Sequence, residues 1–292
     1  MLCNLCPRHC NVTRTQTENI GGFCGMPNSP VLARASLHFW EEPSISGKNG
    51  SGTIFFSGCS LHCTFCQNVD ISTKNKGKQV TAKKLTEIFK KLEDAGAHNI
   101  NLVTPTHFVH SIISALDIYR PNIPIVYNTS GYETVETLKL LKDYVDIYLF
   151  DFKYINSEKA KLYSNAYDYP EICKAALREV YSQQSECVFQ ADGIMQNGII
   201  VRHLLMPAST NDAINIFEWV RVNTPNVYFS LMSQYIPCGK AKDMPIINRK
   251  ITNREYEKVV DYIINSGFKN CYIQEKGSAD TKYIPEFDFT GI

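Results

Sequence analysis

The chain has 292 residues, 44% of them hydrophobic, and a formal net charge of +1. This length accommodates one α/β barrel of roughly 200 to 250 residues plus a small appendage, and the near-neutral charge argues against nucleic acid or a membrane surface as a partner. No apolar run reaches the roughly 18 residues of a membrane span, and the amino terminus lacks the apolar core of a signal peptide, so we expect a cytoplasmic protein. In that reducing compartment the 11 cysteines are expected to be metal ligands or reduced thiols before disulfides.

Residues 1–50 are expected to form a separate cysteine-rich, metal-binding segment, and residues 51–292 to form the main domain. Cys3, Cys6 and Cys10 make a CxxCxxxC pattern, and Cys24 follows them. Four thiolates suit a structural zinc ion or a second iron–sulfur cluster. A segment of reduced thiols without metal is the alternative, although so short a segment with little apolar periodicity is hard to stabilise otherwise.

Residues 35–43 combine aromatic and acidic side chains, and two interpretations stand. One is a strand whose apolar side chains pack on the main domain, namely Leu37, Phe39 or Trp40. The other is that polar side chains just before the first main-domain strand reach the active site, namely His38, Glu41 or Glu42.

A strand is predicted from Gly52 to Ser57, and the loop directly after it carries Cys59, Cys63 and Cys66 in a CxxxCxxC pattern. Three thiolates on one short loop hold three corners of a cubic iron–sulfur cluster and leave the fourth iron open. The alternatives are a zinc knuckle that lacks a ligand, an ordinary electron-transfer cluster with four thiolates, and three unconnected buried thiols.

From residue 52 onward, predicted strands alternate with amphipathic helices. The strands are predicted at 52–57, 100–103, 125–127, 145–150, 198–205 and 227–232. A hairpin turn is expected at Asp192-Gly193, and the last helix is expected to open with the capping pair Thr252 and Glu255. Repeated strand–helix units of this length give parallel strands with right-handed crossovers, so the predicted fold class is α/β.

Parallel strands covered by helices bring the loops at their carboxyl ends to one rim, which is where barrel active sites lie. The cysteine loop follows the first strand and therefore belongs to this rim. Polar residues at the other strand ends become candidates by position: Thr104, Thr106, His107, Asn128, Ser130, Asp151, Lys153, Arg202, His203, Gln234 and Gln274. Each has an alternative role as a capping or loop hydrogen-bond partner.

With Phe65 before its last cysteine, the CxxxCxxC loop resembles the signature of radical S-adenosylmethionine (SAM) enzymes. Within that superfamily the chain resembles the activating enzymes of glycyl-radical enzymes, most closely the homologues of pyruvate formate-lyase activating enzyme. The cysteine-rich start, residues 37–43 and Ser57-Gly58-Cys59 share in the resemblance. It implies a partial (β/α)6 TIM-type barrel with a small cysteine-rich extension, a 4Fe-4S cluster on Cys59, Cys63 and Cys66, and Phe65 near the adenine of SAM.

Strand-end motifs match the activating enzymes in part. Residues 128–131 read Asn-Thr-Ser-Gly where those enzymes have a motif like Asp-Thr-Asn-Gly, and Asp151-Phe152-Lys153 stands in place of Asp-Leu-Lys; in the family both motifs approach SAM. The leading carboxylate of the first motif has been lost to Asn128. At the second strand the superfamily's Gly-Gly-Glu-Pro, which meets the SAM amino group, is absent, so backbone carbonyls near Thr104 and a polar contact from Thr106 or His107 are expected to replace it.

The resemblance implies an oxidoreductase that reductively cleaves SAM to methionine and a 5′-deoxyadenosyl radical, which abstracts a substrate hydrogen. A flavodoxin or ferredoxin is the expected reductant. The expected substrate is a glycine in an extended loop of a partner glycyl-radical enzyme, and a small molecule or a different peptide is the alternative. A non-catalytic electron-transfer protein is a third interpretation, against which the open fourth iron argues.

Overall fold

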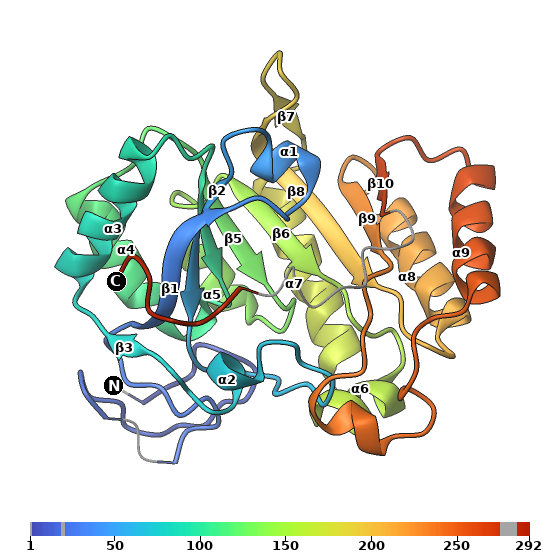
Figure 1. Ribbon diagram of the computed structural model, residues 1–292, viewed down its shortest axis with the longest axis horizontal. Coiled ribbons are helices and arrows are strands. Elements are labelled where there is room, and N and C mark those ends of the chain that lie inside the picture. Colours follow the sequence, from blue (N-terminus) through green and yellow to red (C-terminus); the bar gives the residue numbers. More distant parts are fainter. Residues whose placement is uncertain (1, 19–20, 275–284) are drawn as a thin grey trace.

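A computed structural model of the chain describes residues 2–18, 21–274 and 285–292. Its centre is an open, twisted sheet with the strand order β10-β9-β8-β6-β5-β4-β2-β1-β3 (Figure 1). Neighbouring strands are parallel from β10 to β2. These strands are β2 (Ser51–Phe56), β4 (Ile100–Val103), β5 (Ile125–Thr129), β6 (Ile147–Asp151), β8 (Met195–Leu204), β9 (Tyr228–Met232) and β10 (Cys271–Ile273). The predicted α/β class and partial barrel are confirmed, and β10 at the edge is the strand after which Gln274 was expected.

The antiparallel strands lie at the margins of this parallel core. β1 (Val31–His38) pairs with β2, and the two-residue β3 (Lys78–Gln79) pairs with β1. β7 (Val188–Phe189) pairs with β8 in the predicted hairpin, whose turn uses Gly193 at φ +85°. This hairpin extends β8 toward its amino end, so β8 begins before the predicted residue 198.

Helices cover the outer face of the sheet, with α3 and α4 over one half and α7, α8 and α9 over the other (Figure 1). The longer helices are α3 (Ala82–Asp94), α4 (Val109–Ile118), α7 (Tyr169–Gln183), α8 (Thr210–Asn223) and α9 (Asn253–Asn265). The shorter ones are α1 (Pro43–Ser46), α2 (Val69–Ser72), α5 (Val135–Leu140), α6 (Ser157–Ser164) and the 3-10 helices η1 (Thr106–Phe108) and η2 (Gly239–Asp243). As predicted from its three- and four-residue spacing, α3 buries Leu85, Ile88, Phe89 and Leu92.

Alternation along the strands separates the two faces of the sheet. Val126, Leu149 and Ile200 belong to an inner apolar cluster, whereas their sequence neighbours pack outward under the helices. Ile45 of α1 joins this inner cluster, so the segment after β1 crosses the concave face of the sheet. Nearer the carboxyl ends of the strands, the side chains that point to the inner face become polar. A ligand-binding site can form where this change occurs.

The residues after β1 differ from one of the two expectations for residues 35–43. A strand is present, but Phe39 and Trp40 follow its end and are 49% and 63% exposed. Of the three apolar candidates, Leu37 lies within the strand and pairs with Gly52 of β2, whereas the two rings follow it because the chain leaves the sheet at His38. The acidic residues that follow turn inward instead.

The cysteine-rich amino-terminal segment lies on the same side of the sheet as α2 and α6 (Figure 1). Arg8 ties it to the barrel by donating to the carbonyl oxygens of Ser60, Ser164 and Asn165 at 2.7, 2.9 and 2.6 Å. Arg14 is buried and donates to the carbonyl oxygens of Met26 and His107 at 2.8 Å each. Among the described helices, none has the length and apolar character that a membrane crossing needs.

Candidate active site

A cavity of about 270 Å³ opens at the carboxyl ends of the parallel strands. All three cysteines of the loop after β2 border it. So do side chains from the ends of four further strands, namely Thr104, Asn128, Ser130, Asp151, Lys153 and Arg202, and Gln234 beyond β9. The parallel topology therefore brings residues far apart in the sequence to one rim.

The cysteine loop is fixed by a close backbone approach and by hydrogen bonds to its sulfurs. Gly58 has φ +83°, and a Cβ there would lie 2.3 Å from the Met26 Cγ, so the loop needs glycine at this position. The Leu61 amide donates to the Cys59 Sγ at 3.3 Å, and the Ser164 hydroxyl donates to the Cys63 Sγ at 3.0 Å. Burial raises the pKa of the Cys59 thiol to about 12.

The number of thiols on this loop suits a cluster with an open corner. A closed structural zinc site takes four protein ligands, and the loop offers three. In a cubic cluster each thiolate binds a different iron at its own corner. Three thiols bordering one roomy cavity, with hydrogen-bond donors at their sulfurs, fit that requirement.

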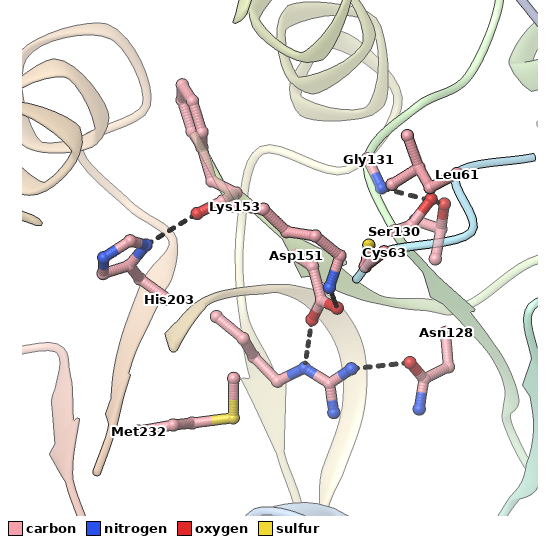
Figure 2. Close-up of polar contacts among 12 residues, drawn as sticks. Leu61, Cys63, Asn128, Ser130, Gly131, Asp151, Lys153, His203 and Met232 are labelled. Carbon is pink, nitrogen blue, oxygen red and sulfur yellow. Dashed lines mark hydrogen bonds and ion pairs between the residues drawn. The ribbon is translucent and has the colours of Figure 1, made fainter. Parts of the chain in front are cut away.

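The floor of the cavity is a network of buried charges around Arg202. Its Nε donates to Asp151 at 2.9 Å, one terminal nitrogen donates to Glu41 at 2.9 Å, and the other donates to the Asn128 Oδ1 at 2.6 Å. Lys153 pairs with the second oxygen of Asp151 at 2.6 Å, and the two side chains point toward one another in Figure 2. The cationic neighbours Arg202 and Lys153 outweigh burial and lower the pKa of Asp151, so this carboxylate is ionised.

The segment after β1 contributes to the site, as the second interpretation of residues 35–43 expected. His38 and Glu41 border the cavity, and the Glu41 Oε1 accepts from the side-chain amides of Asn101 and Asn128 at 3.1 and 3.2 Å. Glu42 lies 3.8 Å from Arg202, and burial raises its pKa. An acidic side chain from outside the parallel strands thus reaches into the rim.

Thr104 directly follows β4 in a backbone conformation that is rare for its residue type. Its φ is +58°, and its amide donates to the Asn128 carbonyl oxygen at 2.9 Å, which joins the ends of β4 and β5. A β-branched residue in the left-handed region costs of order 1 to 3 kcal/mol, and such strain concentrates at functional sites.

Two predicted cofactor contacts are not brought to the cavity. Phe65 is buried against Tyr154, Tyr163 and Tyr235. Thr106 is buried and donates to the Glu133 Oε1 at 2.6 Å. Of the remaining positional candidates, His107, His203 and Gln274 do not line it either, and the ring nitrogens of His107 and His203 face the backbone carbonyls of Ser57 and Phe152 at 2.7 Å.

Glu133 is a residue that the sequence reasoning did not single out. It is buried, accepts from the hydroxyls of Thr106, Thr129 and Tyr127, and burial raises its pKa to about 7. A single acidic residue among polar and apolar neighbours gives no sequence pattern from which its buried, hydrogen-bonded position could be predicted.

Comparison with known proteins assigns the chain to a family. A sequence model of the Radical SAM superfamily matches residues 53–185. The uncharacterized protein MJ0674 of Methanocaldococcus jannaschii is 35% identical over 269 residues, which cover 89% of this chain and 73% of that protein. The chain belongs to the radical SAM superfamily. Its cofactors are accordingly a 4Fe-4S cluster and SAM, as expected from the sequence.

The solved structures of SuiB share the fold of this chain. SuiB of Streptococcus suis bound to S-adenosylmethionine aligns with a TM-score of 0.54 at 16% identity, over 75% of this chain and 48% of SuiB. SuiB bound to its precursor peptide SuiA gives the same TM-score at 14% identity, over 75% and 47%. The chain thus spans about half the length of SuiB. A domain of pyruvate-formate lyase-activating enzyme from Bacteroides vulgatus aligns at a TM-score of 0.39 with 14% identity, over 66% of this chain and 91% of the domain.

The rim of this radical SAM protein offers groups of the kind that SAM requires. SAM presents an ammonium, a carboxylate and ribose hydroxyls, so it needs both acceptors and cations within one site. Asp151 and Glu41 supply carboxylate oxygens, Lys153 and Arg202 supply cationic nitrogens, and Asn128 supplies an amide.

Proposed function

We propose that this radical SAM enzyme abstracts a hydrogen atom in the rim cavity, with a glycine of a partner protein as its substrate. The observation that carries the proposal is that Cys59, Cys63 and Cys66 border the same cavity as the charged strand ends. When bound, the cluster supplies the electron that cleaves SAM into methionine and a 5′-deoxyadenosyl radical. The chain's own residues hold, orient and shield these groups.

We assign Cys59, Cys63 and Cys66 as the cluster ligands. The Leu61 amide and the hydroxyls of Ser164 and Ser72, each 3.0 to 3.3 Å from a sulfur, orient the thiolates and offset their charge. Phe65 is a positioning residue in this proposal, because its ring is held among tyrosines and anchors the loop from behind.

We assign the SAM contacts to the strand ends that border the cavity. Asp151 and Asn128 are already fixed by Arg202, so they offer acceptor oxygens without having to reorganise. Lys153 stands beside Asp151 and close enough to Cys63 and Cys66 to interact electrostatically with both. Thr104 and Ser130 complete the polar rim.

The substrate and the reductant are inferred from resemblance rather than from geometry. Likeness to glycyl-radical activating enzymes favours a glycine in an extended loop, and SuiB, which shares the fold, binds a precursor peptide. A flavodoxin or ferredoxin is the proposed reductant. A small molecule or a different peptide is the second candidate, because the altered second-strand motif departs from the activating enzymes.

Cluster assembly tests the ligand assignment directly. We expect Cys63→Ala to lose cluster iron and all 5′-deoxyadenosine formation after anaerobic reconstitution, because two thiolates do not hold the cube. Cys271→Ala, in β10 and away from the cavity, is the matched control and retains both. A Cys63→Ala protein with intact cluster absorbance and turnover would falsify the assignment.

The substrate is tested by adding a candidate glycyl-radical enzyme to the reduced, SAM-loaded protein. An organic radical on the partner, detected by electron paramagnetic resonance, supports the activating function. Deoxyadenosine formation that responds only to a small molecule or a peptide favours the second candidate. A reducible cluster that never cleaves SAM with any substrate contradicts both and indicates electron transfer.

A further inference from the structure

The four amino-terminal cysteines converge on a second, much smaller cavity. Cys3, Cys6, Cys10 and Cys24 all border a space of about 10 Å³. Ser60 of the cluster loop and His107 close its other side. None of these four cysteines borders the rim cavity.

The small size of the cavity favours a single ion among the ligands that four thiolates accept. A space of about 10 Å³ holds a body the size of one water molecule, whereas a cubane core contains four irons and four sulfides. The rim cavity beside Cys59, Cys63 and Cys66 is about 270 Å³. We propose that Cys3, Cys6, Cys10 and Cys24 bind a single tetrahedral metal ion of the zinc class, and that this ion anchors the amino-terminal segment against the cluster loop.

The surroundings of the sulfurs suit a tetrathiolate ion. The Phe23 amide donates to the Cys10 Sγ at 3.3 Å, and Arg14 approaches the Cys3 Sγ at 3.6 Å. Four thiolates around a divalent ion carry a net charge of −2, which Arg14 and the nearby Arg8 offset. As placed, no three such donors among the described residues hold one ion, so we expect binding to draw the sulfurs inward across the small gap.

The backbone of the amino-terminal segment makes tight turns of the kind that surround a bound ion. Residues between and after the cysteines adopt left-handed conformations, namely His9 at φ +42°, Asn11 at +52° and Gly25 at +69°. The His9 amide donates to the Cys6 carbonyl oxygen at 3.1 Å, which closes a tight turn inside the CxxCxxxC pattern. Conformations of this kind cost free energy, and a bound ion offsets that cost.

His107 adds an imidazole to the wall of the same cavity. Its Nε2 lies 2.7 Å from the Ser57 carbonyl oxygen and therefore carries the proton in the neutral ring, which leaves Nδ1 as the acceptor. His107 is 3% exposed, and its Nδ1 has no hydrogen-bond partner among the described residues. An unpaired nitrogen lone pair buried in this wall is costly, and a cation bound nearby offsets that cost.

The ion would be mechanically linked to the cluster loop. Arg8, which lies inside the CxxCxxxC pattern, donates to the Ser60 and Ser164 carbonyl oxygens, and the Ser164 hydroxyl donates to Cys63. Phe23, next to Cys24, stacks on His62 of the cluster loop with ring centroids 4.5 Å apart. Losing the ion should therefore loosen the cluster loop without removing any of its ligands.

Metal counting on the full chain tests the proposal. We expect one zinc per chain in the wild-type protein and in Cys187→Ser, a half-buried cysteine of the β7 region far from the segment, and almost none in Cys10→Ser. Reconstituted iron should stay at one cubane per chain in all three. Zinc retained by Cys10→Ser, or a second cubane's worth of iron in the wild type, would overturn the proposal.

Cobalt substitution keeps the test valid if Cys10→Ser does not fold. Cobalt added to the metal-free wild-type chain should give the absorption of a tetrahedral thiolate site, with sulfur-to-cobalt charge transfer, at one equivalent. An octahedral spectrum, or no saturable binding, would contradict the site. Neither measurement depends on SAM cleavage. A failure of the zinc-site proposal can therefore be distinguished from a failure of the proposed function.

Discussion

Arg202 shows how a single residue organises the floor of the site. Its guanidinium bonds to Asp151 on β6, Asn128 on β5 and Glu41 on the segment after β1. All of these charged side chains are at least four-fifths buried, with 11% exposure for Arg202 and 12% and 16% for the two carboxylates. A planar fork with several donors suits this role, and lysine's single ammonium does not reproduce it.

We expect Arg202→Met to lower the free energy of unfolding by about 3 kcal/mol, because it leaves Glu41 buried without its cation. Lys153 still pairs with Asp151, which limits the loss. Arg202→Lys keeps the charge without the fork, so it should cost less than the methionine variant. Urea denaturation of the three proteins measures both, and a methionine variant as stable as the wild type would show that the network does not stabilise the fold.

Glu133 gives the molecule a pH dependence with a definite sign. Burial raises its pKa from an ordinary 4.5 to about 7 in the folded chain. Between these values the unfolded chain loses its proton while the folded chain keeps it, so stability falls as the pH rises from 4.5 to 7. Below this range the protonated carboxyl does not lower the free energy of unfolding through ionisation, and above it the full free-energy penalty of burying the charge applies.

The matched variant Glu133→Gln removes this titration and keeps the shape. Relative to the wild type, we expect it to gain roughly 3 kcal/mol in unfolding free energy between pH 4.5 and pH 7.5, at about 1.4 kcal/mol per pKa unit. Parallel urea titrations at the two pH values give the difference. Equal pH profiles for the two proteins would mean that Glu133 ionises as easily inside the fold as outside it.

At the scale of elements, α9 illustrates how local sequence defines a helix end. The Thr252 hydroxyl accepts from the Glu255 amide at 3.2 Å, and the Glu255 carboxylate accepts from the Thr252 amide at 2.8 Å, which is the predicted capping box. Glu255 also accepts from the Ala208 amide at 2.8 Å, so the cap fastens α9 to the loop before α8.

Thr252→Ala should lower the free energy of unfolding by about 1 kcal/mol, since it removes the hydroxyl that satisfies the first turn of α9. Thr252→Ser keeps the hydroxyl and should stay close to the wild type. Thermal unfolding followed by circular dichroism compares the three. If alanine and serine behave alike, the cap contributes nothing and the Glu255 contacts alone hold the helix start.

The strands and the cysteine loop were predictable because their signals are local. A run of apolar residues, a glycine and three spaced cysteines lie within 17 residues at 52–68, and the rim follows from parallel topology. The Glu41–Arg202 bond joins residues 161 positions apart, and no local pattern announces it. Phe65 and Thr106 fail to reach the cavity because their side-chain directions depend on tertiary neighbours, namely three tyrosines and Glu133.

Across the whole molecule, the amino-terminal segment and the barrel rim are joined by long-range contacts. Arg8 bonds to the cluster loop at Ser60 and to the end of α6 at Ser164 and Asn165, more than 150 residues away. Its guanidinium also lies 4.0 Å from the Phe23 ring centre. The segment therefore supports the rim from one side, while the crossing at Glu41 supports it from the concave face.

This arrangement predicts that loosening the segment acts locally on the rim. In Arg8→Ala the carbonyl oxygens of Ser60, Ser164 and Asn165 lose a charged donor. This loss should lower the free energy of local opening by about 1.4 kcal/mol or more. Amide hydrogen exchange across residues 57–68 and at the end of α6 should accelerate about tenfold, whereas β8 and β9 keep their protection. Arg221→Ala, which removes a pair with Glu218 on α8, is the control and should leave the loop unchanged. Uniform acceleration over the whole sheet would mean that the segment stabilises the fold as one unit, and unchanged exchange in the loop would mean that the cluster loop holds its shape without the segment.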